Sequence, residues 1–216
     1  MATFEGDDKM SRRPQVDSHD TRRKLIASAE EEFAQQGYEK ASLRRICSRI
    51  GVTTGALYFF FNNKEDLFKN VIQPVTDQAI QILKEYQSRI QSEGVREESD
   101  SPMGDVETLG AFFDLMYAHR YVVTIIINNQ NSPFVAKFFE SFKSVIAATI
   151  QTILYPGATY IEPYDSFIIE WLAQTEMTTI IDILRNDKTR QEADGHVTSA
   201  LVFTQGGLKA LANGQF

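Results

Sequence analysis

Apolar residues recur every three or four positions along nearly the whole chain, and almost no segment shows the strict alternation of a half-buried strand. This spacing places apolar side chains on one face of a helix. Of the 216 residues, 43% are hydrophobic, which is enough to fill a real core. The sequence therefore predicts an all-α protein of about nine helices.

Residues that start and end helices divide the chain into an N-terminal arm followed by helical segments. The arm, residues 1–16, is polar, and its basic pair Arg12 and Arg13 is a candidate for contact with a minor groove. A capping box of Asn62 and Glu65 is expected to start a long fourth helix that bends at Pro74. The expected helices are 17–37, 42–50, 54–60, 62–91, 105–127 with a break near His119, 133–155, 163–185 and 192–212.

Charge is distributed unevenly between the two parts of the chain. The net charge is −7, which by itself argues against a nucleic-acid partner. Residues 1–70, however, hold 12 Lys and Arg against 11 Asp and Glu, whereas the remainder holds 10 against 18. The acidity thus lies almost entirely outside the first third, which leaves that third free to approach DNA.

Two short helices around Gly51 and Val52 have the spacing of a helix-turn-helix. Glycine suits a turn that requires positive φ, and Val52 is expected to close the turn against the first helix. The third helix would then present Thr53, Thr54, Gly55 and Tyr58 outward, where a major groove can accept them.

A run of residue types over about fifty positions resembles the signature of the TetR (tetracycline-repressor-like) family of transcriptional regulators. Many positions agree in both type and spacing. They are Phe33-Ala34-Gln35-Gln36-Gly37-Tyr38, Ser42, Ile46, Gly51-Val52, Gly55, Leu57-Tyr58, Phe61, Lys64, Glu65 and Leu67.

The resemblance implies a role for several residues of this segment. Tyr58 and Lys64 are expected to hold phosphates and Ser42 to lie near the DNA backbone, while Arg44 and the edge from Thr53 to Gly55 approach bases. Two positions depart from the usual pattern: Phe60 stands where His or Tyr is common, and Cys47 replaces a small Ala. Arg45 and Arg49 are interpreted as solvated, and Cys47 as a small core residue.

The family resemblance also implies an effector-binding and dimer-forming domain C-terminal to the helix-turn-helix. The aromatic candidates for an effector pocket are Phe112, Phe113, Tyr117, Tyr121, Phe138, Phe142 and Trp171. The candidates for a two-fold interface on the last two helices are Ile168, Leu172, Thr175, Thr179, Val202 and Gly206. For both sets, ordinary packing within the chain remains an open alternative.

No motif indicates an enzyme, a cofactor or a metal site. The single cysteine excludes an intrachain disulfide and points to a reducing compartment, so we expect a cytoplasmic protein. The first residues do not resemble a secretion signal, and the longest strongly apolar stretch is far too short to cross a bilayer.

These observations predict three parts: a flexible arm over 1–16, a helix-turn-helix domain over 17–63, and an effector-binding and dimerisation domain over 64–216, with the fourth helix as connector. The predicted function is that of a homodimeric repressor that releases a near-palindromic DNA operator when a small molecule binds. A helical adaptor that binds only protein and a regulator that needs no effector are the alternatives.

Overall fold

The computed structural model describes residues 18–96, 101–102, 104–158, 160 and 162–212. These residues form helices and no strand, which confirms the predicted all-α class. The predicted arm, with Arg12 and Arg13, lies outside the described residues. The helices are α1 (Ser18–Lys40), α2 (Leu43–Arg49), α3 (Thr54–Phe60), α4 (Lys64–Glu93), α5 (Val106–Ala118), α6 (Arg120–Asn128), α7 (Pro133–Leu154), α8 (Pro163–Asn186) and α9 (Arg190–Ala212).

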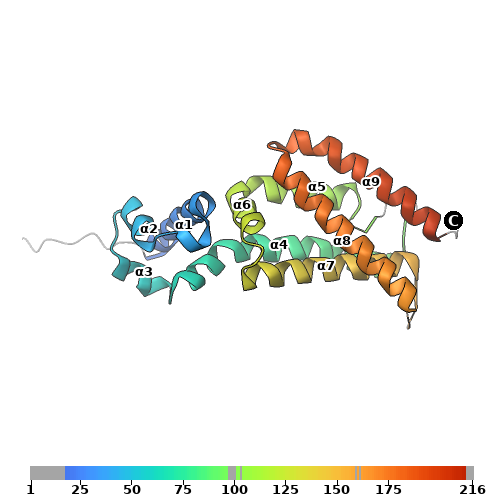
Figure 1. Ribbon diagram of the computed structural model, residues 1–216, viewed down its shortest axis with the longest axis horizontal. Coiled ribbons are helices and arrows are strands. Elements are labelled where there is room, and N and C mark those ends of the chain that lie inside the picture. The colour runs from blue at the N-terminus through green and yellow to red at the C-terminus, as the bar shows by residue number, and fades with distance from the viewer. Residues whose placement is uncertain (1–17, 97–100, 103, 159, 161, 213–216) are drawn as a thin grey trace, which may run out of the picture.

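The helices form a small cluster at one end and a larger bundle at the other (Figure 1). Helices α1, α2 and α3 make the small cluster, and α4 runs from it along the bundle. Helix α7 packs against both α4 and α8, while α9 contacts α5, α7 and α8. Helix α4 is therefore shared by the two parts of the molecule.

The small cluster is held by a core to which each of its helices contributes. Leu25 and Phe33 of α1, Ile46 of α2 and Leu57 of α3 are all buried. The four-residue spacing from Leu25 to Ala29 and Phe33 puts these α1 side chains on one face, as the sequence predicts.

The turn between α2 and α3 has the conformation expected from its sequence. Gly51 has φ of 71°, a left-handed value that glycine adopts without steric cost. The N–H of Val52 donates to the Cys47 carbonyl at 3.0 Å, and the Val52 side chain packs against the core. The Thr53 hydroxyl then accepts a hydrogen bond from the Ala56 N–H at 3.2 Å and so caps α3.

The start of α4 corrects one detail of the sequence prediction. The capping residue is Asn63, whose Oδ1 accepts from the Asp66 N–H at 2.8 Å. The Asp66 carboxylate in turn accepts from the Asn62 N–H at 2.9 Å. The helix thus begins at Lys64, and Asn63 and Asp66, rather than the predicted Asn62 and Glu65, supply the capping side chains.

The predicted break near His119 is present. Helices α5 and α6 meet there at an angle of 90°. Helix α6 packs on α1, and the backbone N–H of Tyr38 donates to Oδ1 of Asn129 at 3.3 Å. This contact joins the end of α1 to the end of α6. Among the described helices, none alone is long and apolar enough to cross a membrane; α5 and α6 reach that length and composition only when the bent pair is taken together.

A buried carboxylic acid lies between α8 and α9. The Glu176 side chain is almost fully enclosed, and Oε1 accepts a hydrogen bond from the Thr204 hydroxyl at 2.7 Å. Burial raises the pKa of Glu176, an effect that the Thr204 hydrogen bond opposes only in part. The fold therefore favours the protonated acid.

Replacing Glu176 by Gln should stabilise the protein by about 1 kcal/mol at neutral pH, because the amide keeps the acceptor without the cost of a buried charge. The raised pKa destabilises the wild-type protein as pH rises above about 4.3, so the advantage of the variant should shrink toward acidic pH. Thermal unfolding of both proteins across this range measures the difference. Glu140→Gln, at an exposed position of α7, is the matched control; equal effects of the two changes would contradict the prediction.

Candidate nucleic-acid interface

The outward edge of α3 is formed by its first turn and by one residue of its second. Thr53, Thr54 and Gly55 are exposed, and Tyr58 is 55% exposed. On the opposite face, Leu57 is completely buried. The helix is thus anchored by Leu57 while Thr53, Thr54 and Tyr58 face solvent, which is the orientation predicted from the sequence.

Gly55 is not required by packing within the chain. A Cβ atom built at this position would lie 3.6 Å from the Thr53 hydroxyl and would meet no other side chain or neighbouring backbone within 4 Å. Because Gly55 has no side chain, the backbone of α3 is open to solvent at this position. An external surface can therefore approach the backbone closely.

Ser42 and Arg44 lie at the start of α2. The Ser42 hydroxyl accepts from the Arg45 N–H at 3.4 Å and caps α2. The Arg44 side chain is exposed, one residue inside the helix. A guanidinium in that position can form two parallel hydrogen bonds with a phosphate or with a guanine edge.

Lys64 lies in the first turn of α4, where helix N–H groups favour an anion. Its ammonium nitrogen Nζ donates to the Glu39 carbonyl at 3.0 Å and lies 4.9 Å from the centre of the Tyr38 ring. These contacts hold the positive charge at the junction of α1 and α4. Two of the three ammonium protons remain available for other acceptors.

Aromatic side chains continue from Tyr58 toward the end of α3. Phe59 is 81% exposed, and its ring meets the Phe60 ring edge to face at 5.0 Å. Phe60, which stands where the family often has His or Tyr, is partly buried and packs against the core. Sequence reasoning did not single out Phe59; the signal available was its position directly after Tyr58 on the outward side of a short helix.

A buried ion-pair network fixes α2 against α1. Glu32 is 1% exposed. Its Oε1 accepts from Arg45 Nε at 2.8 Å and from the Ser42 N–H at 3.0 Å, and its Oε2 accepts from Arg49 Nη2 at 3.2 Å. Arg49 also donates to the Ser28 carbonyl at 2.8 Å.

Arg45 and Arg49 are exposed, as their interpretation as solvated residues requires, but each also forms an ion pair with the buried Glu32, which the sequence analysis did not predict. Burial acts to raise the pKa of Glu32, but the hydrogen bonds from Arg45 and Ser42 outweigh it, so the pKa lies below its ordinary range. The carboxylate is ionised and the arginines neutralise it. The sequence held a signal for this arrangement, since Glu32 falls between Ala29 and Phe33 on the buried face of α1.

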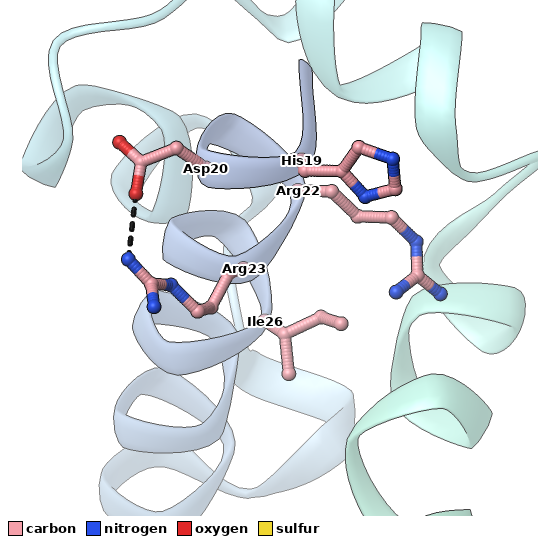
Figure 2. Close-up of a pocket in the computed structure, with 5 residues that line it drawn as sticks. All are labelled: His19, Asp20, Arg22, Arg23 and Ile26. Atoms are coloured by element: carbon pink, nitrogen blue, oxygen red, sulfur yellow. Dashed lines mark hydrogen bonds and ion pairs between the residues drawn. The ribbon is translucent and has the colours of Figure 1, made fainter. Parts of the chain in front are cut away.

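The start of α1 forms an open hollow beside this interface (Figure 2). Arg22 donates to Asn70 Oδ1 at 2.6 Å, and its guanidinium lies 5.4 Å from the centre of the Phe61 ring. Arg23 points the other way and pairs with Asp20 at 2.8 Å. Arg22 therefore ties α1 to α4.

Cys47 is buried in the same small core. Burial raises the pKa of its thiol, so the reactive thiolate is disfavoured. This environment agrees with the interpretation of Cys47 as a core residue.

The aromatic residues predicted to form an effector pocket are distributed over several places. Phe112, Phe138 and Phe142 line a small apolar cavity of about 30 Å³ between α5, α6, α7 and α8. Phe113 is buried elsewhere in the core, and the Tyr117 hydroxyl donates to the Asp187 carbonyl at 3.2 Å. Tyr121 and Trp171 are exposed and do not line the cavity.

The residues predicted for a two-fold interface lie on α8 and α9 and differ in exposure. Val202, Gly206 and Thr175 are exposed. Ile168, Leu172 and Thr179 are half-buried. The surface formed by these helices also includes three exposed aromatic rings, those of Phe167, Trp171 and Phe203.

The N-terminal segment of the chain is similar in sequence to known bacterial regulators. The profile of the family described as "Bacterial regulatory proteins, tetR family" matches residues 25–71. The repressor BepR of Brucella suis is 36% identical over 61 residues, which is 28% of this chain and 29% of BepR. The regulator AcrR of Shigella flexneri is 32% identical over 80 residues, or 37% of each chain. The alignments thus span about a third of these relatives.

The fold is similar over a much larger share of the chain. SmeT, the repressor of the SmeDEF multidrug efflux pump of Stenotrophomonas maltophilia, superposes with a TM-score of 0.60 at 18% identity, covering 88% of this chain and 91% of SmeT. A transcriptional regulator of Aquifex aeolicus superposes with a TM-score of 0.54 at 19% identity, covering 91% and 99%.

The turn at Gly51 and the exposed edge of α3 have the geometry of a helix-turn-helix unit. Its relatives are regulators rather than enzymes, in agreement with the absence of a catalytic motif in the sequence. Residues 25–71 are similar to the tetR family of bacterial regulatory proteins, and the described helices share the fold of solved transcriptional regulators.

Replacing Glu32 by Gln should destabilise the protein by about 2 kcal/mol at neutral pH, because two guanidinium groups lose their buried counter-charge. The lowered pKa means that this contribution is present above about pH 4.3 and is lost as pH falls through the folded-state pKa. The two unfolding curves should therefore converge at acidic pH. Glu39→Gln, at an exposed position of the same helix, is the control; a Glu32→Gln protein as stable as this control would contradict the prediction.

Proposed function

We propose that the protein is a transcriptional repressor that binds a near-palindromic DNA operator as a homodimer and releases it when a small molecule binds. The observation that carries the proposal is the outward edge of α3, with Leu57 anchored in the core and Thr53, Thr54, Gly55 and Tyr58 exposed. Residues 17–63 act as the reader and residues 64–216 as the effector and dimerisation domain. The site of action is the cytoplasm.

The surface offers separate groups for phosphates and for bases. Tyr58 and Lys64 bind phosphates on either side of α3, and Ser42 lies near the backbone. Arg44 and the edge from Thr53 to Gly55 approach base edges in the major groove. Phe59 adds an apolar ring that is suited to contact with a thymine methyl group.

One recognition helix contacts only a few base pairs. Two paired subunits contact two half-sites and so recognise a longer operator. Among the described residues, five large apolar side chains are exposed on α8 and α9: Phe167, Trp171, Val202, Phe203 and Leu211. Such a concentration of exposed apolar side chains is typical of an interface. Gly206 lacks a side chain beside them and permits close approach of a second backbone.

The effector is proposed to act through the elements that join the two parts. Enlarging the cavity around Phe112, Phe138 and Phe142 would displace α6 and α7, and α6 is linked to α1 through Asn129 and Tyr38. A preference of about 1.4 kcal/mol for the displaced state lowers DNA affinity tenfold. The small size of the cavity favours a second candidate, a repressor that needs no effector, because small-molecule sites usually measure about 300 Å³ or more.

Removing either phosphate group should weaken binding to every duplex. Tyr58→Phe and Lys64→Gln are each expected to reduce affinity severalfold, and Lys64→Gln should lower the slope of log affinity against log salt by about one unit. Electrophoretic mobility shifts with operator and random duplexes at several salt concentrations measure both effects. Lys188→Gln, in the turn between α8 and α9, controls for loss of one positive charge. Normal DNA binding by both variants would refute the assigned phosphate contacts.

Introducing charge on the apolar surface of α9 should separate the subunits. Phe203 is 80% exposed in the single chain, so Phe203→Asp costs little within a subunit but buries a carboxylate in a dimer. We expect a dimeric wild-type protein and a monomeric variant by analytical ultracentrifugation, with weaker operator binding. Tyr121→Asp, at an exposed aromatic position of α6, should remain dimeric. A Phe203→Asp protein that is still dimeric would place the interface elsewhere.

A further inference from the structure

A groove of about 470 Å³ runs between α4 and α7 on the outside of the bundle. The two helices lie side by side over much of their length (Figure 1). Its volume is in the range of small-molecule sites and far exceeds the 30 Å³ of the cavity lined by Phe112 and Phe142. Phe138 borders both spaces, with the groove on the solvent side.

Positive charge is concentrated along this groove. Lys69 and Lys84 project from α4 and Lys137 from α7, against a single carboxylate, that of Asp77. The Asp77 Oδ2 atom already accepts a hydrogen bond from Gln73 Nε2 at 3.1 Å. None of the three lysines forms an ion pair with another described residue. Residues 71–216 carry an excess of eight acidic groups, so a groove with unpaired lysines is unlike its surroundings.

The floor of the groove is apolar. Ile72 is buried beneath it, and Ile80 and Phe134 are partly buried on its two sides. The Lys69 ammonium lies 5.5 Å from the centre of the Phe134 ring. Lys137 follows Phe134 by three residues and therefore lies on the same face of α7. One end of the groove thus combines two cations with an aromatic surface.

We propose that this groove binds an amphipathic anion: a free carboxylic acid on an apolar chain or ring. The carboxylate lies between Lys69 and Lys137, and the apolar body covers Phe134, Ile72 and Ile80. A neutral or cationic amphiphile of the same shape leaves the lysines without a counter-charge and is bound more weakly.

The groove is also connected through α4 to the proposed DNA contact at Lys64. Lys69 lies five residues after Lys64 on the same helix, so an anion at Lys69 that shifts α4 also shifts the proposed phosphate contact. This consequence rests on the proposed function, whereas binding in the groove does not.

Isothermal titration of the full chain, without DNA, with decanoate, 1-decanol and decyltrimethylammonium below their micelle concentrations tests the site. Decanoate should bind with one site per chain and about tenfold more tightly than the other two compounds. Lys69→Gln combined with Lys137→Gln should weaken decanoate binding by about tenfold or more, and Lys188→Gln should leave it unchanged.

Ser141→Trp provides an independent test, because it fills the groove from an exposed position without removing a core side chain. It should abolish decanoate binding and leave the unfolding temperature unchanged. Equal binding of the three amphiphiles would overturn the proposal. So would decanoate binding that survives both the lysine changes and Ser141→Trp.

A second measurement separates the groove from the proposed function. Operator affinity is compared with and without saturating decanoate in the wild-type and double-lysine proteins. A decrease in the wild type alone supports coupling through α4. Unchanged operator affinity, with binding that still depends on the lysines, overturns the coupling and leaves the site in place. A protein that binds decanoate but no duplex refutes the proposed function and not the groove.

Discussion

The orientation of α3 depends on a carboxylate that α3 does not contact. Glu32 of α1 holds the start of α2 through the Ser42 N–H and the middle and end of α2 through Arg45 and Arg49. Because α2 continues into α3 through the single turn at Gly51, fixing α2 also fixes the direction in which α3 leaves. A buried charge is stable here because each of its oxygens has a partner, and loss of one partner would leave part of that charge uncompensated.

Helix α4 contacts α1 of the small cluster and also the helices of the larger bundle. Its first residue, Lys64, is tied to the end of α1 through the Glu39 carbonyl, and Asn70 is tied to the start of α1 through Arg22. Its buried apolar side chains from Leu67 to Leu83 belong to one continuous core that also includes side chains of α1 and α7. A displacement of α4 in the bundle is therefore transmitted to α1, since both ends of that helix are anchored to it. The second link, from Tyr38 to Asn129 of α6, acts on the same end of α1 as Lys64.

Local signals were sufficient to predict most of the fold. The helix limits, the left-handed Gly51 and the break at His119 follow from caps, glycines and apolar spacing, which act over a few residues. The shift of the cap from Asn62 to Asn63 arises because adjacent asparagines offer the same chemistry, and only the backbone conformation selects between them.

Contacts between distant segments were harder to predict. Periodicity places Trp171 and Phe112 on helical faces but does not say which face meets solvent, so a pocket hypothesis included both an exposed and a buried ring. The ion pairs of Arg45 and Arg49 were not predicted either. Their partner Glu32 lies on α1 whereas both arginines lie on α2, and periodicity along one helix does not show which residues of another helix it meets. The exposed edge of α3 was predicted correctly, since the helix-turn-helix spacing fixes which side is anchored by Leu57.

The ion pairs within the reader bear on the strength of the proposed DNA contact. Arg23, Lys24, Arg45 and Arg49 all have acidic partners within the chain. Arg44 and Lys64 therefore carry much of the uncompensated charge near α3, and a subunit with few such cations releases few counterions on binding a duplex. In the proposed dimer, the affinity of one subunit for a duplex is then small, and tight binding depends on both subunits contacting the operator. For such a protein, a modest change in the spacing of the two readers is sufficient to release DNA, because neither subunit retains it alone.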